Sequence, residues 1–94
     1  MKTAIVRHIL VKDKDFAEQL KQRIQSGTDF ATIAKQHSTC RSASKGGELG
    51  EVKKGQLVPV IDRVVFSAAE RVLHGPIKSQ FGFHLLEIKF RMDF

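Results

Sequence analysis

Two apolar segments at opposite ends of the chain each place a single histidine on a face that is otherwise nearly all apolar. In residues 3–11, TAIVRHILV, the histidine is His8, and in residues 79–90, SQFGFHLLEIKF, it is His84. The expected neighbours on these faces are Ala4, Val6 and Leu10 beside His8, and Gly82, Leu86, Ile88 and Phe90 beside His84. Alternation with a period of two is typical of β-strands with a buried face. A fold of this chain must therefore find partners for two buried imidazoles.

These two segments are the longest expected strands, and both have apolar residues on both faces. They are the best candidates for the centre of a sheet, where both faces are covered. If they are neighbours, His8 and His84 can lie side by side. With 94 residues, 41% of them hydrophobic, the chain can bury one modest core, so we expect a single domain over residues 1–94.

Two helices are expected directly after the first strand. Asp13 or Asp15 can cap the first, and Gly27 provides a left-handed stop. Asp29 can cap the second, which follows at once. The residues at helical spacing are Phe16, Ala17, Leu20 and Ile24 in the first helix, and Phe30, Ile33, Ala34 and His37 in the second. Each helix therefore has one apolar stripe to bury.

The second half of the chain predicts shorter elements. Residues 38–47 read as a loop of about ten residues, long enough to suggest a function. A short strand is expected over residues 48–52, and Pro59 suits the first turn of a brief helix. Residues 71–78 predict a strand interrupted by Gly75-Pro76, a pair that fits an edge or a bulge. This order of elements indicates an α+β domain with helices on a small sheet.

The charge of the chain points to anions but not to one class of partner. Lys and Arg number 16 against 10 Asp and Glu, a formal net charge of +6, and no long run of one sign occurs. A solvated surface explains alternating charges at least as well as a nucleic-acid groove does. Weak nucleic-acid binding stays open as an alternative, although no platform of aromatic and basic residues accompanies the lysines. The lysines that could contribute are Lys35, Lys45, Lys53 and Lys54.

Cys40 is the only cysteine, so no disulfide can form within the chain, and we expect a reduced thiol. The apolar run near the N-terminus is short and broken by Arg7 and His8, and it lacks a small-residue cleavage site, so it does not resemble a signal peptide. No stretch approaches the roughly 20 apolar residues that span a bilayer. We therefore expect a cytoplasmic protein without a membrane partner.

The histidines and the cysteine are the residues most able to carry chemistry. An imidazole can donate at one nitrogen and accept at the other, so two histidines beside a hydroxyl or thiol can form a hydrogen-bonded chain whose proton order can switch. Cys40 lies in the long loop and could be the third member. Two structural core histidines and an inert cysteine are the simpler alternative. A zinc site is disfavoured without CxxC or HxxxH spacing, and no cysteine-protease signature surrounds Cys40.

Three stretches together identify a resemblance: HILV with His8, GTDFATIAKQHSTCRSASKGGELGEVKKGQLVP, and GPIKSQFGFHLLEI. In this order they resemble the parvulin family of peptidyl-prolyl cis/trans isomerases, over essentially the whole chain and most closely the small stand-alone bacterial members. The resemblance implies a four-stranded antiparallel sheet surrounded by helices, an FKBP-like superfold. It also implies an enzyme that accelerates rotation about X-Pro bonds without a cofactor or a metal.

The resemblance further implies a site on the sheet face, with His8, Cys40 and His84 in the catalytic positions. The positions implied for substrate binding are Leu57, Ile61 and Phe81 around the proline ring, Ser79 in the histidine network, and Gln56 close by. The implied partners are proline-containing segments of unfolded or flexible client proteins. We expect the protein to act as a monomer.

One departure from the family pattern, and one difference from its phosphate-directed members, bear on activity. Most active members have Met and Phe where this chain has Leu57 and Ile61, so a module that binds proline segments with weak turnover stays as an alternative to an efficient isomerase. The family's phosphate-directed members use a basic cluster in a longer loop after the first strand. Here that loop is only VKDKD, in which aspartates offset the lysines, so phosphorylated substrates should not be preferred.

Overall fold

The computed structural model describes residues 1–93, so residue 94, the last of the predicted domain 1–94, lies outside the described residues. The elements follow one another in the predicted order, with one short 3₁₀ helix, η1, inside the segment that was expected to be a loop. They are β1 (Lys2–Val11), α1 (Lys14–Gln25), α2 (Phe30–His37), η1 (Arg41–Lys45), β2 (Glu48–Lys53), α3 (Pro59–Val65), β3 (Leu73–Ser79) and β4 (Gly82–Asp93).

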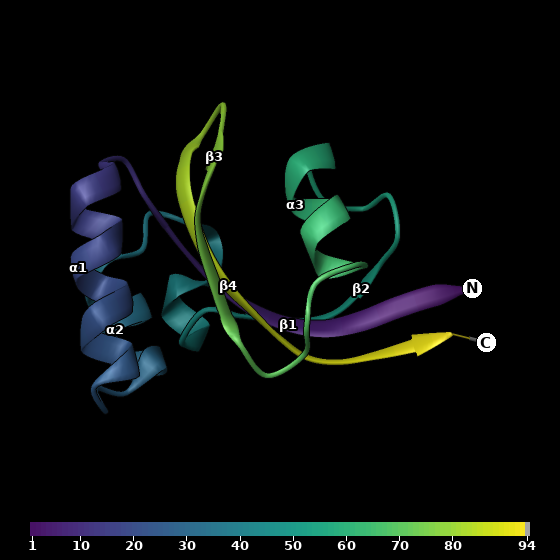
Figure 1. The fold of residues 1–94 in the computed structure, drawn as a ribbon, viewed down its shortest axis with the longest axis horizontal. Helices are drawn as coiled ribbons and strands as arrows, with labels where there is room; N and C mark the ends of the chain where they lie inside the picture. The colour runs from purple at the N-terminus through teal and green to yellow at the C-terminus, as the bar shows by residue number, and fades with distance from the viewer. Residues whose placement is uncertain (94) are drawn as a thin grey trace.

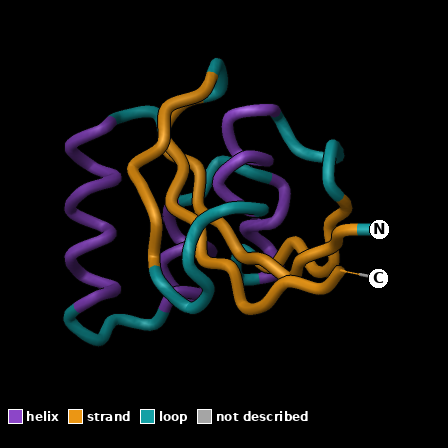
Figure 2. Tube along the Cα trace, turned by 45° about the vertical axis from the view of Figure 1, so that its right-hand side comes forward, coloured by secondary structure: helices purple, strands orange, loops and turns teal. Residues whose placement is uncertain are grey.

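The four strands form one antiparallel sheet in the order β2-β1-β4-β3. The first and last strands are therefore the central neighbours, as the sequence predicted. Helices α1 and α2 lie on one side of the sheet and α3 on the other (Figure 1). Because β1 and β4 are antiparallel with Lys2 opposite Asp93, the start of β1 and the end of β4 lie side by side (Figure 2). The sheet thus supports two separate apolar layers.

The helix ends follow the capping residues. Asp13 accepts a hydrogen bond from the Phe16 N–H at 2.9 Å, so it, and not Asp15, caps α1. Asp29 caps α2 by accepting from the Thr32 N–H at 3.0 Å. Each carboxylate pairs with an N–H group that has no partner within its own helix. In α3, Pro59 occupies the first turn, where a missing N–H costs nothing.

A buried cluster fills each side of the sheet. Under α1 and α2 it consists of Ile9, Val11, Ala17, Leu20, Phe30, Ile33, Ala34 and Leu85. Under α3 it consists of Ala4, Val6, Val52, Ile61, Val65, Leu86 and Ile88. The second cluster includes four of the predicted apolar neighbours of the two histidines, which are Ala4, Val6, Leu86 and Ile88. No helix within residues 1–93 has the length and apolar character needed to cross a membrane.

Three bulges interrupt the strand pairing. Leu49 has no partner on β1, Lys89 has none there either, and Gly75 and Pro76 together lie opposite one residue of β4. The last of these confirms the bulge expected from the Gly-Pro pair, on the edge strand β3. A bulge changes which face the following side chains occupy.

The bulge at Lys89 corrects one expectation about the face of β4. Phe90 was expected to share a face with Ile88, but it pairs with Ile5, while Ile88 pairs with Val6. Directly paired residues share a face and adjacent residues of β1 do not, so the extra residue turns Phe90 to the opposite side of the sheet. It is 46% exposed there and contributes nothing to the histidine face.

We expect Gly47→Ala to destabilise the protein more than Gly55→Ala. Both glycines have positive φ angles, +85° and +90°, at which an alanine costs about 1–2 kcal/mol. A Cβ at Gly47 would also lie 2.6 Å from the His8 carbonyl oxygen and 2.9 Å from Phe30, whereas a Cβ at Gly55 meets nothing within 4 Å. The additional loss at Gly47 should be about 1–3 kcal/mol in the free energy of unfolding, measured in urea. Equal losses would contradict the close packing of Gly47 against β1.

Candidate functional site

The two histidines meet on the α3 side of the sheet. His8 of β1 pairs with Leu86, and His84 of β4 pairs with Leu10, so the imidazoles are diagonal neighbours on one face. His8 Nε2 lies 2.9 Å from His84 Nδ1, a direct hydrogen bond, and the ring centroids are 5.0 Å apart. Both residues are buried, with exposed fractions of 6% and 4%. The structure confirms that the imidazoles are partners for one another.

The hydrogen-bonded chain continues beyond the pair. Ser79 Oγ lies 2.6 Å from His84 Nε2 and accepts the Phe81 N–H at 3.1 Å. At the other end, His8 Nδ1 has no partner among the described residues. An unpaired buried N–H is the rarer kind of defect. This favours the order in which His8 Nε2–H donates to His84 and His84 Nε2–H donates to Ser79, which leaves only a lone pair unpartnered on His8.

Burial keeps both imidazoles neutral at neutral pH. It desolvates the charged form of His8 and, with the repulsion of His84 as the smaller cause, lowers the pKa of His8 from 6.5 to about 4. Burial also lowers the pKa of His84 from its ordinary value. A neutral imidazole can serve as donor and acceptor at once, which the chain from His8 to Ser79 requires.

Next to the histidines lies a cavity of about 290 Å³, called the proline pocket below after the substrate that the resemblance implies. Its walls are formed by His8, Leu10, Cys40, Leu49, Leu57, Val58, Ile61, Phe81 and His84. Nearly all of the lining is apolar. Phe81 is 54% exposed and stands at the β3–β4 turn, while Ile61 is only 3% exposed. An apolar hollow with a few convergent polar groups is typical of small binding sites.

The segment that carries Cys40 is attached to β1 by three hydrogen bonds. Leu10 N–H donates to Ser38 Oγ at 3.0 Å, and the Leu10 carbonyl accepts from the Thr39 N–H at 2.7 Å and from its hydroxyl at 3.2 Å. Cys40 then precedes η1, and its sulfur accepts from Ser42 Oγ at 3.4 Å. The long loop therefore brings the thiol to the pocket wall without a bond between Cys40 and the histidines.

Most of the predicted site residues come together in this place. His8, Cys40, His84, Leu57, Ile61 and Phe81 line the proline pocket, and Ser79 joins the histidine network. Gln56 does not line the pocket: it is exposed, and its side chain accepts the Lys53 N–H at 3.0 Å within a turn.

Sequence reasoning missed Leu10, Leu49 and Val58 as pocket walls. Leu10 could have been found, because it alternates onto the face of His8. Val58 directly precedes the helix that carries Ile61. Leu49 points to the pocket through the bulge in β2, for which the sequence gives only the adjacent Gly50 as a signal.

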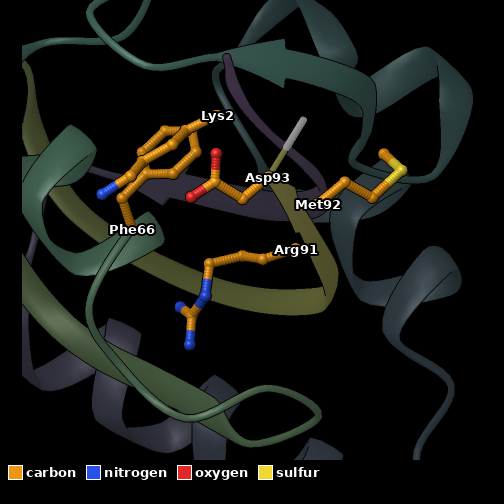
Figure 3. Close-up of a pocket in the computed structure, with 5 residues that line it drawn as sticks. All are labelled: Lys2, Phe66, Arg91, Met92 and Asp93. Atoms are coloured by element: carbon orange, nitrogen blue, oxygen red, sulfur yellow. The ribbon is translucent and has the colours of Figure 1, made fainter.

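Another cavity, of about 230 Å³, lies near the chain ends and is lined by Lys2, Phe66, Arg91, Met92 and Asp93 (Figure 3). Arg91 there donates to the Val65 carbonyl at 2.9 Å, so its guanidinium joins β4 to the end of α3. Neither imidazole reaches this cavity. Among residues 1–93, no group of three His, Cys, Asp or Glu side chains is placed to hold a metal ion.

Comparison with known proteins shows that most of the chain matches one family of domains. The family model described as "Rotamase: PPIC-type PPIASE domain" matches residues 8–89. Among solved structures, the parvulin NmPin of Nitrosopumilus maritimus superposes with a TM-score of 0.84 at 31% identity, covering 94% of this chain and 96% of NmPin. The peptidylprolyl isomerase PrsA of Bacillus anthracis has a TM-score of 0.93 at 28% identity, covering 98% of this chain and 43% of PrsA.

Curated relatives include longer proteins. The chain is 41% identical over 98 residues to the chaperone SurA of Methylococcus capsulatus, and 38% identical over 81 residues to the foldase protein PrsA of Bacillus subtilis. These alignments cover 94% and 85% of this chain. The chain spans only 22% of the length of that SurA and 28% of that PrsA. The likeness is thus to one domain of each longer relative.

Acidification should destabilise the fold through the histidine pair. The native pKa of His8 is about 4 and the unfolded value is 6.5, so the unfolded chain takes up the proton first. The contribution of neutral His8 to the free energy of unfolding is fully present above about pH 6.5 and is lost as the pH falls toward 4. The loss from His8 should be on the order of 3 kcal/mol in the free energy of unfolding, measured by urea titration at pH 7, 5 and 4.

His8→Gln is the matched variant for this measurement, because Gln keeps a hydrogen-bonding side chain but does not titrate. It should lower the stability at pH 7, since its amide replaces an imidazole bonded to His84. Its decline between pH 6.5 and 4 should be flatter than that of the parent protein. An unchanged slope would show that His8 does not carry the effect.

Proposed function

The chain belongs to the PPIC-type, or parvulin, family of peptidyl-prolyl cis/trans isomerase domains, and we propose that it accelerates X-Pro bond rotation in unfolded or flexible proteins. The observation that carries the proposal is the apolar pocket walled on one side by the neutral pair His8 and His84. Its volume of about 290 Å³ is ample for a proline ring and its neighbouring amide.

The reaction needs no covalent step; it needs a site that stabilises the twisted amide. Rotation about an X-Pro bond faces a barrier of about 18–20 kcal/mol, set by amide resonance. As the amide twists, its carbonyl becomes more ketone-like and its nitrogen pyramidal. An apolar pocket that holds the ring and excludes water therefore favours the twisted state over both planar states. Lowering the barrier by about 5–7 kcal/mol would accelerate the reaction about 10⁴- to 10⁵-fold.

In this mechanism the histidines shape the pocket and do not transfer a proton to the substrate. The hydrogen bond between the two rings occupies one nitrogen of each, and the hydrogen bond to Ser79 occupies the other nitrogen of His84. Protonation would place a charge beside the proline ring and would break the alternation of donors and acceptors. Cys40 contributes a small, weakly polar wall, and its sulfur accepts a hydrogen bond from the hydroxyl of Ser42.

The proposed substrates are proline-containing segments of client proteins, in keeping with relatives that are named foldases and chaperones. A requirement for phosphate is not part of the proposal, because only Lys12 and Asp13 separate β1 from α1 and Asp13 caps the helix. A cytoplasmic location, supported by the lone thiol of Cys40, and a monomeric state remain predictions from the sequence.

A binding module with weak turnover is the second candidate. The exposed ring of Phe81 beside an apolar hollow would suit the capture of proline segments. The aliphatic walls Leu57 and Ile61, in place of Met and Phe, are what favour this alternative. Such a module would bind the same peptides and raise their rate of isomerisation only slightly.

Cis/trans exchange of an X-Pro peptide, followed by two-dimensional NMR without a protease, tests the proposal. Uncatalysed interconversion takes tens to hundreds of seconds, so exchange within about one second at a catalytic protein concentration establishes turnover. Shifted peptide signals without faster exchange would favour the binding module.

Cys40→Ser should keep most of the rate of exchange, because no thiol ester is formed. Complete inactivity of a folded Cys40→Ser protein would contradict the non-covalent mechanism.

Ile61→Phe should lower stability without raising turnover. An aromatic ring at this position could pack against proline if the site had room, but Ile61 is only 3% exposed and packs in the cluster under α3. A larger side chain there must displace its neighbours, at a cost of about 1–3 kcal/mol. The melting temperature and the exchange rate should be measured on the same sample.

Leu57→Met is the matched control, because Leu57 lines the same pocket but is only half-buried. This exchange keeps the side-chain volume approximately and should cost less than about 1.5 kcal/mol. A faster Ile61→Phe protein of unchanged stability would show that the buried isoleucine faces the proline more openly than the structure indicates.

A further inference from the structure

A second hollow adjoins the proline pocket, and its lining is more polar than that of the proline pocket. It has a volume of about 280 Å³ and shares two of its walls, Cys40 and Leu49, with the proline pocket. Its other walls are Arg41, Ser42, Ser44, Lys45 and Glu48, from η1 and the start of β2. This hollow is called the polar side pocket below. A peptide held by its proline would therefore have polar protein surface next to it on this side.

The charges of the polar side pocket do not cancel. Glu48 is paired with Lys89, whose Nζ lies 2.8 Å from the carboxylate. Arg41 and Lys45 are exposed, and within residues 1–93 neither side chain has an ion-pair partner. The two hydroxyls are already engaged, Ser42 with the sulfur of Cys40 and Ser44 with the Arg41 carbonyl. Arg41 and Lys45 are thus available to pair with an anion of a bound molecule.

We propose that the polar side pocket binds the carboxylate of an Asp or Glu that lies within about two residues of the isomerised proline. Arg41 and Lys45 are then residues that determine specificity. This inference rests on the proposed isomerase function. An extended chain advances by about 3.3–3.6 Å per residue, so the residues next to a bound proline reach the adjoining hollow. The proline pocket itself offers no charge with which to select neighbours.

A carboxylate suits this pocket better than a phosphate. Protein sites for phosphorylated residues rely on clusters of arginine, which pair with several phosphate oxygens at once. The polar side pocket has one arginine and one lysine, and Glu48 is part of its wall. Flanking acidic side chains are therefore the expected ligands.

The test uses peptides that share one proline and carry Glu or Gln at one of four places, the two residues before it and the two after it. Exchange rates are measured by NMR for the parent protein and for the double variant Arg41→Gln, Lys45→Gln. At one place at least, Glu should exceed Gln in kcat/KM by about three- to tenfold, the range expected for two exposed ion pairs. The advantage should lie mainly in KM, and the double variant should lose it.

The salt dependence gives a second readout. At an ionic strength of about 1 M the Debye length falls to about 3 Å, so the preference for Glu should shrink while the rates for Gln peptides stay the same. The matched control is Lys2→Gln with Arg23→Gln, which removes the same charge from two exposed residues that line neither the proline pocket nor the polar side pocket. It should keep the full preference.

The outcomes separate this proposal from the proposed function. Equal rates for Glu and Gln at all four places, with turnover present, would overturn the specificity proposal alone. A preference that survives in the double variant, or that the control also loses, would likewise overturn the assignment to Arg41 and Lys45. A phosphoserine peptide favoured more than tenfold over Glu would overturn the choice of carboxylate. Absence of turnover on every peptide would overturn the isomerase function, and this proposal with it.

Discussion

The hydrogen bond between His8 and His84 is the constraint on which the site depends. Two imidazoles are buried on an apolar sheet face, and an unpaired buried polar group costs about 1–3 kcal/mol. The observed register of β1 against β4 places the two rings within hydrogen-bonding distance of one another. A slip by one residue would turn an imidazole toward the opposite core, under α1 and α2. The position of the pocket therefore depends on how β1 pairs with β4.

The shape of the pocket depends on irregularities in that sheet. Bulges free Leu49 to face the pocket and turn Phe90 away from the histidine side. Close packing at Gly47 holds the end of the η1 segment against β1, where the His8 N–H donates to the Gly47 carbonyl at 2.8 Å. Regular strands would have aligned the same residues differently. The walls of the site are in this sense set by departures from ideal pairing.

The site separates its apolar and its charged surfaces. In the proposed reaction, neutral histidines and aliphatic walls surround the amide that loses its resonance, and charge there would favour water over the substrate. Arg41 and Lys45, which have no ion-pair partner among the described residues, line the adjoining polar side pocket. Selection of flanking residues can thus act through binding, while the twisting of the bond depends on the apolar walls.

The sequence by itself determined the elements and the central strands, and its resemblance to the parvulin family indicated most of the pocket. Alternation around His8 and His84, the aspartate caps and the Gly-Pro pair are local patterns, and each has a local physical cause. Gln56 bonds to Lys53 within its own turn, which is a local contact, whereas tertiary structure alone decided that Phe90 leaves the histidine face and that Leu49 joins it. It also decided that Ile61 is buried. These outcomes depend on an unpaired residue in a strand or on the fit between a helix and a sheet, which are properties of contacts between distant segments and leave no period in the chain.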